Sequence, residues 1–149
     1  MVRFSAFGFC GLPLRPPLRY GSSLRMSLGK HVILDLYGCS LAALDDLALL
    51  ERLALEAVRA SNGTILGHQS HKFTPQGATV LVMVAESHLS LHTWPEHAYV
   101  AVDYFTCGDR VLSDEAVRTL REGLRPTRVV RRDVARGDEA SGPGEEAAQ

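Results

Sequence analysis

Short apolar runs separated by turn residues fill the middle of the chain and predict most of its secondary structure. Residues 31–37 are mostly apolar, end at Gly38 and predict a strand. Leucine and alanine then recur at helical spacing over residues 41–60, with charged residues between them, and Asn62-Gly63 follows as a stop signal. This part of the chain is therefore predicted to form a strand and one amphipathic helix.

The second half of the pattern predicts several strands and another helix. Residues 64–73 alternate imperfectly, which indicates a half-exposed strand that ends at the turn Thr74-Pro75-Gln76-Gly77. The remaining predicted elements are strands at 78–86, 87–92 and 99–105, a helix at 114–123 and a strand at 127–131. This order predicts an α+β fold, a two-layer sandwich with a mainly antiparallel sheet and two helices on one face.

Both ends of the chain differ in composition from the middle. The first 25 residues contain four arginines, three prolines and no acidic residue, and Met26 is followed by Ser-Leu-Gly-Lys-His and the first predicted strand. We interpret residues 1–25 as a disordered leader or an upstream start outside the functional domain. Beyond Asp133 the chain is rich in Gly, Glu and Ala, so residues 134–149 are predicted to be a disordered tail. The predicted domain spans residues 26–133.

Composition narrows the class of protein further. The chain has 149 residues, is 46% hydrophobic and 22% charged, and carries a net charge of -1, which is typical of one globular domain and does not indicate a nucleic-acid partner. No apolar run approaches the roughly 18 residues of a membrane span. Its three cysteines are widely spaced and form no CxxC pair, which fits a reducing cytoplasm better than a disulfide framework.

One constellation along the chain suggests chemistry. Glu86-Ser87-His88 follows an apolar run, His92 comes five residues after the serine, and Cys107 ends the next predicted strand. A metal site is not expected, because the six histidines lack an HExxH helix pattern or an accompanying CxxC. Ser87 is not in the GxSxG elbow of a serine hydrolase. From these residues alone, Cys107 is either a core cysteine or a thiol nucleophile beside His92.

Three separated motifs then occur in order along the chain. Leu-Gly-Lys-His at 28–31 and Tyr-Gly-Cys at 37–39 form the first, and His-Lys-Phe-Thr-Pro-Gln-Gly at 71–77 the second. The third is Ala-Glu-Ser-His-Leu-Ser-Leu-His-Thr-Trp-Pro-Glu-His-Ala-Tyr at 85–99, followed by Ala-Val-Asp-Tyr-Phe-Thr-Cys-Gly at 101–108. From about Met26 to about Arg132, the chain resembles the prokaryotic S-adenosylmethionine decarboxylase family, whose members depend on a pyruvoyl group.

The resemblance implies a proenzyme that cleaves itself between Glu86 and Ser87. The Ser87 hydroxyl would attack the Glu86 carbonyl to form an ester, and β-elimination followed by hydrolysis would turn Ser87 into a pyruvoyl group. His92 matches the family residue that serves as base for the Ser87 α-proton. The pyruvoyl ketone would form a Schiff base with the substrate amine and accept electrons when CO2 leaves. Cys107 matches the proton donor that completes turnover.

The resemblance also implies a substrate pocket and an assembly. Phe73 matches an aromatic residue that stacks on adenine, and Glu96 matches a carboxylate that binds the ribose hydroxyls. Thr79 stands where the family usually has a serine that supports processing, so slower processing is expected. Val80 and Ala98 replace common glycines. The family further implies a homodimer of processed αβ units with the site near the protomer interface.

Three functions fit these residues. The first is decarboxylation of S-adenosylmethionine, which supplies the aminopropyl donor for spermidine synthesis. The second keeps the pyruvoyl chemistry but acts on arginine or ornithine, and the presence of both Phe73 and Glu96 favours the adenosyl substrate over these. The third is a non-catalytic paralogue that binds without being cleaved. Retention of Ser87, His92 and Cys107 together argues against it.

Overall fold

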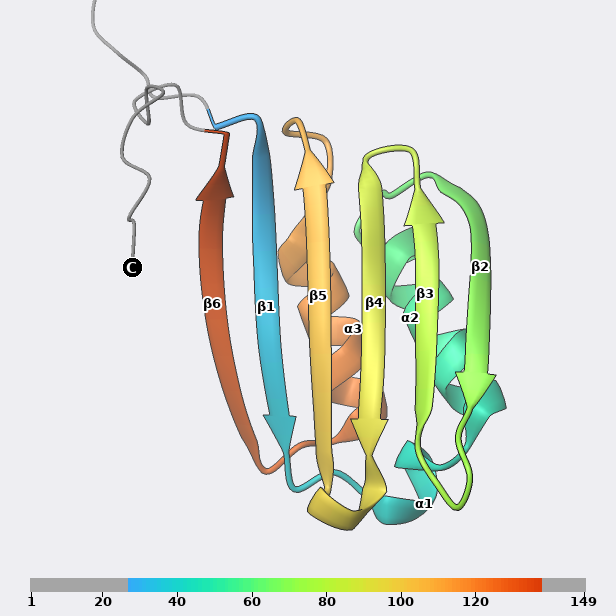
Figure 1. Ribbon diagram of the computed structural model, residues 1–149. Coiled ribbons are helices and arrows are strands. Elements are labelled where there is room, and N and C mark those ends of the chain that lie inside the picture. The colour runs from blue at the N-terminus through green and yellow to red at the C-terminus, as the bar shows by residue number, and fades with distance from the viewer. Residues whose placement is uncertain (1–26, 138–149) are drawn as a thin grey trace, which may run out of the picture.

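Alternation of side chains along antiparallel strands gives this chain one covered and one open sheet face. The computed structural model describes residues 27–137, and within them the strands form one six-stranded antiparallel sheet of order β2-β3-β4-β5-β1-β6 (Figure 1). Its strands are β1 (Gly29–Tyr37), β2 (Ile65–Lys72), β3 (Ala78–Val84), β4 (Ser87–Trp94), β5 (Tyr99–Cys107) and β6 (Arg128–Arg136). Its helices are α1 (Leu41–Leu44), α2 (Leu47–Ala60), α3 (Ser113–Leu124) and the 3-10 turn η1 (Pro95–His97).

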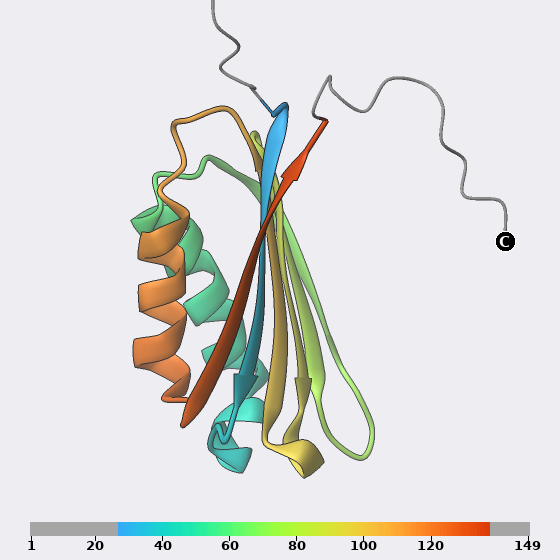
Figure 2. The ribbon, with the colours of Figure 1, turned by 90° about the vertical axis from the view of Figure 1, so that its left-hand side faces the viewer.

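The core lies between the sheet and the two long helices. Seen edge-on, α2 and α3 cover the same face of the sheet, and no helix of residues 27–137 covers the opposite face (Figure 2). Every second residue of each central strand points into this core and is fully buried, as Leu34, Leu89 and Val100 are. The helices contribute matching apolar stripes, which include Leu50 and Leu120. The predicted α+β sandwich is therefore confirmed.

The helix predicted over residues 41–60 is interrupted, so a single helix was wrong. Asp45 ends α1, and Asp46 begins α2 by accepting a hydrogen bond from the backbone N–H of Leu49 at 3.0 Å. Adjacent aspartates bind nearby backbone groups in non-helical conformations, which favours a cap over a continuous helix. The break also frees Asp45 to reach another part of the molecule.

Two strand boundaries also differ from the prediction. The strand predicted at 78–86 ends at Val84, because Ala85 and Glu86 form the turn that leads into β4. Strand β6 runs to Arg136, opposite Gly29 of β1, so the first residues of the predicted tail belong to the sheet. The predicted leader, residues 1–25, and the rest of the predicted tail lie outside the described residues, apart from Gly137.

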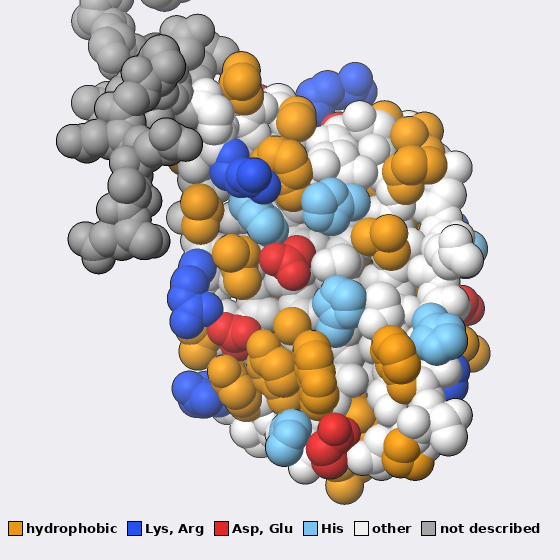
Figure 3. Space-filling model, viewed as in Figure 1, with side chains coloured by type: hydrophobic (Ala, Val, Ile, Leu, Met, Phe, Trp, Pro, Cys, Tyr) orange, Lys and Arg blue, Asp and Glu red, His pale blue; other side chains and the backbone are white. Residues whose placement is uncertain are grey.

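The open face of the sheet carries most of the chemically interesting side chains. Histidines and hydrophobic side chains gather across it (Figure 3). The rings of Tyr37 and Tyr99 stack with centroids 5.0 Å apart, Trp94 stacks on Tyr99 at 5.3 Å, and the Arg128 guanidinium lies 3.9 Å above Tyr37. No helix within residues 27–137 is long and apolar enough to cross a membrane.

Candidate active site

The turn between β3 and β4 holds Ser87 in an unusual backbone conformation. Val84 and Ser87 are paired across the hairpin, and only Ala85 and Glu86 connect them. Ser87 has φ of +146°, a region that glycine enters freely and L-residues rarely adopt. Such a conformation costs about 1–3 kcal/mol and persists only where the surrounding structure enforces it. The chain is therefore strained at the residue that follows the expected cleavage point.

Three hydrogen-bonded contacts fix this turn in place. The Ala85 N–H donates to the Thr64 carbonyl at 2.9 Å, and the Glu86 carboxylate accepts from both the N–H and the hydroxyl of Thr64, at 3.0 and 3.1 Å. Hydrogen bonds from Thr64 keep the pKa of Glu86 below its usual value. The N–H of Cys107 donates to the Glu86 carbonyl at 2.9 Å. The Glu86 side of the Glu86–Ser87 bond is thus held by Thr64 and Cys107.

The groups around this bond suit an acyl shift from nitrogen to oxygen. The Ser87 hydroxyl lies 3.2 Å from Nδ1 of His88, and the Glu86 carbonyl already receives a backbone donor of the kind that stabilises a developing oxyanion. Cys107 follows Thr106, the β5 residue paired with Ser87, and its thiol is exposed. Ser87, Glu86 and Cys107 are therefore neighbours at this end of the sheet.

A second group of predicted residues lines a cavity of about 300 Å³ at the other end of β4. Phe73, Thr79, His92 and Glu96 all contribute to it. The hydroxyl of Thr79 is 2.8 Å from Nδ1 of His92, across the β3–β4 ladder, and this contact orients the imidazole. Phe73 is half exposed and meets His71 edge-on at 4.7 Å.

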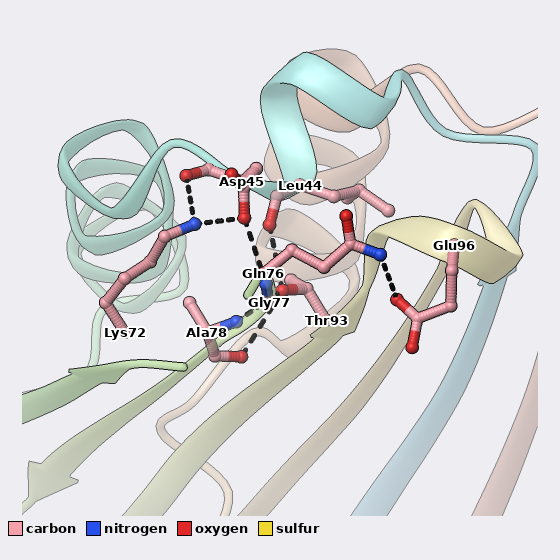
Figure 4. Close-up of polar contacts among 8 residues, drawn as sticks. All are labelled: Leu44, Asp45, Lys72, Gln76, Gly77, Ala78, Thr93 and Glu96. Atoms are coloured by element: carbon pink, nitrogen blue, oxygen red, sulfur yellow. Dashed lines mark hydrogen bonds and ion pairs between the residues drawn. The ribbon is translucent and has the colours of Figure 1, made fainter. Parts of the chain in front are cut away.

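Asp45 and Thr93 anchor the loop that carries part of this cavity (Figure 4). The Asp45 carboxylate accepts from the backbone N–H of Gly77 at 2.9 Å and pairs with Lys72. The Thr93 hydroxyl donates to the Leu44 carbonyl at 2.9 Å and accepts from the Ala78 N–H. On the loop, the Gln76 amide donates to the Glu96 carboxylate at 3.0 Å. The break between α1 and α2 thus helps to shape the cavity.

The two groups of residues do not meet within one chain. Ser87 and His92 are five residues apart on one strand, which is about 16 Å at roughly 3.3 Å per residue. Ala101 is the β5 partner of His92. Cys107 is six residues farther along β5, so it lies about 20 Å from Ala101 by the same spacing. A single copy therefore does not bring His92 to the Ser87 α-proton.

Some residues at these sites were not singled out from the sequence. Thr64 holds the Glu86 carboxylate, and Gln76 and Trp94 line the cavity with Phe73. The position of Trp94 beside Pro95-Glu96 was a signal for its role, whereas nothing in the sequence pairs Thr64 with Glu86, 22 residues later. A wider, more open cavity of about 680 Å³ lies between α3 and β6, but none of the motif residues reaches it.

Comparison with known proteins identifies the family. Residues 30–137 match the family described as S-adenosylmethionine decarboxylase. The S-adenosylmethionine decarboxylase proenzyme of Methanococcus vannielii is 46% identical over 110 residues, covering 74% of this chain and 90% of the relative. The proenzyme of Parasynechococcus marenigrum is 47% identical over 109 residues, covering 73% and 85%.

A solved structure of a similar protein has the same fold. The crystal structure of the adenosylmethionine decarboxylase from Aquifex aeolicus VF5 superposes with a TM-score of 0.71 at 35% identity, covering 83% of this chain and 98% of that one. The antiparallel sheet, the motif order and these matches together define an α+β proenzyme fold. The chain belongs to the S-adenosylmethionine decarboxylase family.

The strain at Ser87 predicts an inverted preference between glycine and alanine. Neither Ser87→Gly nor Ser87→Ala can form the ester, so both stay uncleaved. Glycine relieves the positive φ, and Ser87→Gly is expected to exceed Ser87→Ala in free energy of unfolding by about 1 kcal/mol. Urea denaturation of both chains measures this difference.

Ser90, in the regular part of β4, provides the matched control. There Ser90→Gly is expected to be less stable than Ser90→Ala by about 0.5–1 kcal/mol, because glycine gains nothing from the backbone and loses more entropy on folding. If the alanine variant is more stable than the glycine variant at both positions, the Ser87 conformation stores no strain.

Proposed function

We propose that this protein is a self-processing, pyruvoyl-dependent decarboxylase that converts S-adenosylmethionine to its decarboxylated aminopropyl donor and CO2, for spermidine synthesis. The observation that carries the proposal is the strained Ser87 beside a Glu86 carbonyl that accepts the Cys107 N–H. A nucleophile, an electrophile and an oxyanion donor are already in place at the bond that the family cleaves. Family membership supports the substrate.

Processing would consume Ser87 in three chemical steps. Attack of its hydroxyl on the Glu86 carbonyl turns the amide into an ester. Loss of the Ser87 α-proton then eliminates the Glu86 carboxylate, and hydrolysis of the resulting dehydroalanine releases the Ser87 nitrogen as ammonia and leaves the pyruvoyl group at position 87. These steps break the Glu86–Ser87 peptide bond, so the backbone conformation with φ of +146° no longer exists in the product. Cleavage would therefore release the strain at Ser87.

The residues around position 87 have distinct tasks in the mature enzyme. The pyruvoyl group supplies the carbonyl electrophile and the electron sink that decarboxylation requires. The exposed thiol of Cys107, next to the β5 partner of Ser87, would deliver a proton to the substrate Cα after CO2 leaves. Cys39, by contrast, is buried, and burial raises the pKa of its thiol to about 11, so it has no comparable access.

Phe73 and Glu96 would bind the adenosyl part of the substrate. Both line the 300 Å³ cavity, where an aromatic face and a carboxylate suit a purine ring and a ribose diol. Arginine and ornithine lack both of these groups, so neither would use the cavity. The cavity, however, lies at the far end of β4 from Ser87.

We further propose that a second copy of the chain completes each site. A two-fold axis that lies along the open sheet face, perpendicular to the strands, would bring the His92 end of one protomer against the Ser87 end of its partner, and would do so twice. The aromatic surface of Tyr37, Trp94 and Tyr99 lies on this face and would be covered in the same contact. His92 would then reach the Ser87 α-proton of the other protomer. This arrangement resolves the separation seen within one chain.

A cytoplasmic location fits this chemistry. The proton donor must remain a free thiol, and within residues 27–137 neither Cys39 nor Cys107 forms a disulfide. A reducing compartment preserves thiols in that state.

Intact mass spectrometry and CO2 release test the proposed activity. Purified protein is expected as two fragments divided between Glu86 and Ser87, the second lacking the Ser87 amine nitrogen. It should release CO2 from S-adenosylmethionine and not from arginine or ornithine. A single uncleaved species without activity overturns the proposal, and turnover of arginine or ornithine alone reassigns the substrate.

Mixing inactive variants tests the shared site. Ser87→Ala and His92→Ala are each expected to be inactive, but a mixed dimer contains one site with Ser87 from one protomer and His92 from the other. Random pairing makes half of the dimers mixed, so co-expression should restore about a quarter of wild-type activity. Co-expression that restores nothing shows that both residues act within one chain. The double variant Ser87→Ala/His92→Ala, co-expressed with Ser87→Ala, is the matched control and should remain inactive.

Replacing Cys107 separates processing from turnover. In Cys107→Ala the backbone N–H that donates to the Glu86 carbonyl remains, so cleavage should proceed to completion. CO2 release should fall by about 100-fold or more, because the proton donor is lost. The cleaved fraction on a gel and the rate of CO2 release are measured on the same preparation. Near-normal turnover would show that another group donates the proton.

A further inference from the structure

His88 is the side chain that contacts the nucleophile of self-processing. Among the described residues, its Nδ1 is the only side-chain atom within hydrogen-bonding distance of the Ser87 hydroxyl, at 3.2 Å. His92, which the family motif associates with processing, lies about 16 Å farther along β4. Resting on the proposed function, we infer that His88 is the general base for the first step of processing, the attack of Ser87 on Glu86.

The step balances without any other reagent. Nδ1 of His88 takes the hydroxyl proton as the Ser87 oxygen forms its bond to the Glu86 carbonyl carbon. The carbonyl oxygen gains the electron pair and is held by the Cys107 N–H. When the carbon–nitrogen bond breaks, the imidazolium returns its proton to the Ser87 nitrogen. The products are an ester, a free amine and a neutral imidazole.

Neighbouring strands hold the His88 ring in position for this transfer. His88 is paired with Met83 on β3 and with Phe105 on β5, and its ring lies 6.1 Å from that of Phe105. Phe105 in turn lies 5.7 Å from His31, whose Nε2 is 3.0 Å from Asp103. Apolar side chains therefore flank His88 on both sides and leave Ser87 as its hydrogen-bonding partner.

The charged and titratable groups near His88 lie on β5 and on the strands beyond it, β1 and β6. Asp103 and Cys107 are the diagonal neighbours on β5, and His31 and the Arg136 guanidinium lie against Phe105, the latter at 4.9 Å. On β3, the residues of this face nearest to His88 are Leu81 and Met83, and neither is titratable. None of these groups forms a hydrogen bond to His88, so Nδ1 remains free to accept the Ser87 proton.

Two histidines would then act at successive steps of processing. His88 would act before the ester, on the hydroxyl proton of its own chain. His92, oriented by Thr79, would act after the ester, on the α-proton. This order makes the two variants chemically distinguishable, because hydroxylamine cleaves an ester and leaves an amide intact.

Cell-free synthesis of the full chain, with cleavage followed by gel and intact mass, tests the inference. His88→Asn keeps an oxygen that can accept the Ser87 hydrogen bond but cannot take its proton. It should process at least about 100-fold more slowly than wild type and yield no fragments in hydroxylamine.

His92→Ala should also stay uncleaved, but hydroxylamine should release both fragments. His68→Asn, on the exposed strand β2, is the control and should cleave like wild type.

A second variant guards against loss of structure. His88→Ala should regain cleavage when free imidazole is added, which a misfolded chain would not, and failure of imidazole to restore any cleavage counts against the base. Wild-type cleavage rates in His88→Asn would show that the hydrogen bond alone suffices and overturn the inference. Hydroxylamine-labile His88→Asn would place His88 after the ester and overturn it too. An uncleaved, hydroxylamine-resistant wild-type chain would instead overturn the proposed function, and this inference with it.

Discussion

The hairpin between β3 and β4 imposes the constraint on which the rest of the site depends. Short hairpin turns usually contain a residue with positive φ, a conformation that glycine adopts most easily. Here the position is Ser87, at φ +146°. A glycine would relax the turn but carry no hydroxyl, whereas serine has the hydroxyl but is strained in this conformation. The paired strands on either side of β4 supply the energy that keeps it there.

The chemistry of the open face is divided between its two ends. Ser87, His88 and Cys107 occupy one end, and the cavity with His92 and Glu96 occupies the other. At the cavity end, where Tyr99 is paired with Trp94 and Tyr37, Tyr99 donates a 2.6 Å hydrogen bond to Asp35, which lowers the pKa of that carboxyl, while burial and Asp35 raise the pKa of Tyr99 to about 12. The stacked rings of Tyr37, Trp94 and Tyr99 therefore belong to the cavity end of the face.

Much of this was predictable from the sequence, and the failures have identifiable causes. Alternation and helical periodicity gave the α+β sandwich, because they depend only on which side chains need burial. The break at Asp45-Asp46 was missed because apolar spacing continues through it, and the cap competes only locally. The motif resemblance singled out Ser87, His92 and Cys107 but says nothing of distance. That His92 lies far from Ser87 follows from strand geometry, which no list of motif residues contains.

Ala98 shows where a motif departure acquires a physical meaning. The sequence suggested that a glycine is usual at this position, and the structure gives Ala98 φ of +48° at the end of η1. Its carbonyl accepts the Cys39 N–H at 3.1 Å, so the conformation is fixed by a contact to the loop after β1. Alanine tolerates this region at a modest cost. The departure therefore affects local stability near the cavity and leaves the hairpin at Ser87 untouched.

The strand order has a consequence for the protein after it is cut. Cleavage at Glu86–Ser87 would leave β1, β2 and β3 on one fragment and β4, β5 and β6 on the other. Strand β1 of the first fragment lies between β5 and β6 of the second. The two fragments therefore could not separate unless the strand pairing in the sheet were broken. Once unfolded, however, the mature protein would be two polypeptides that must find each other again. Maturation would thus convert a single chain, which folds by itself, into a two-chain protein whose refolding depends on concentration. Only the uncleaved precursor could fold as one polypeptide.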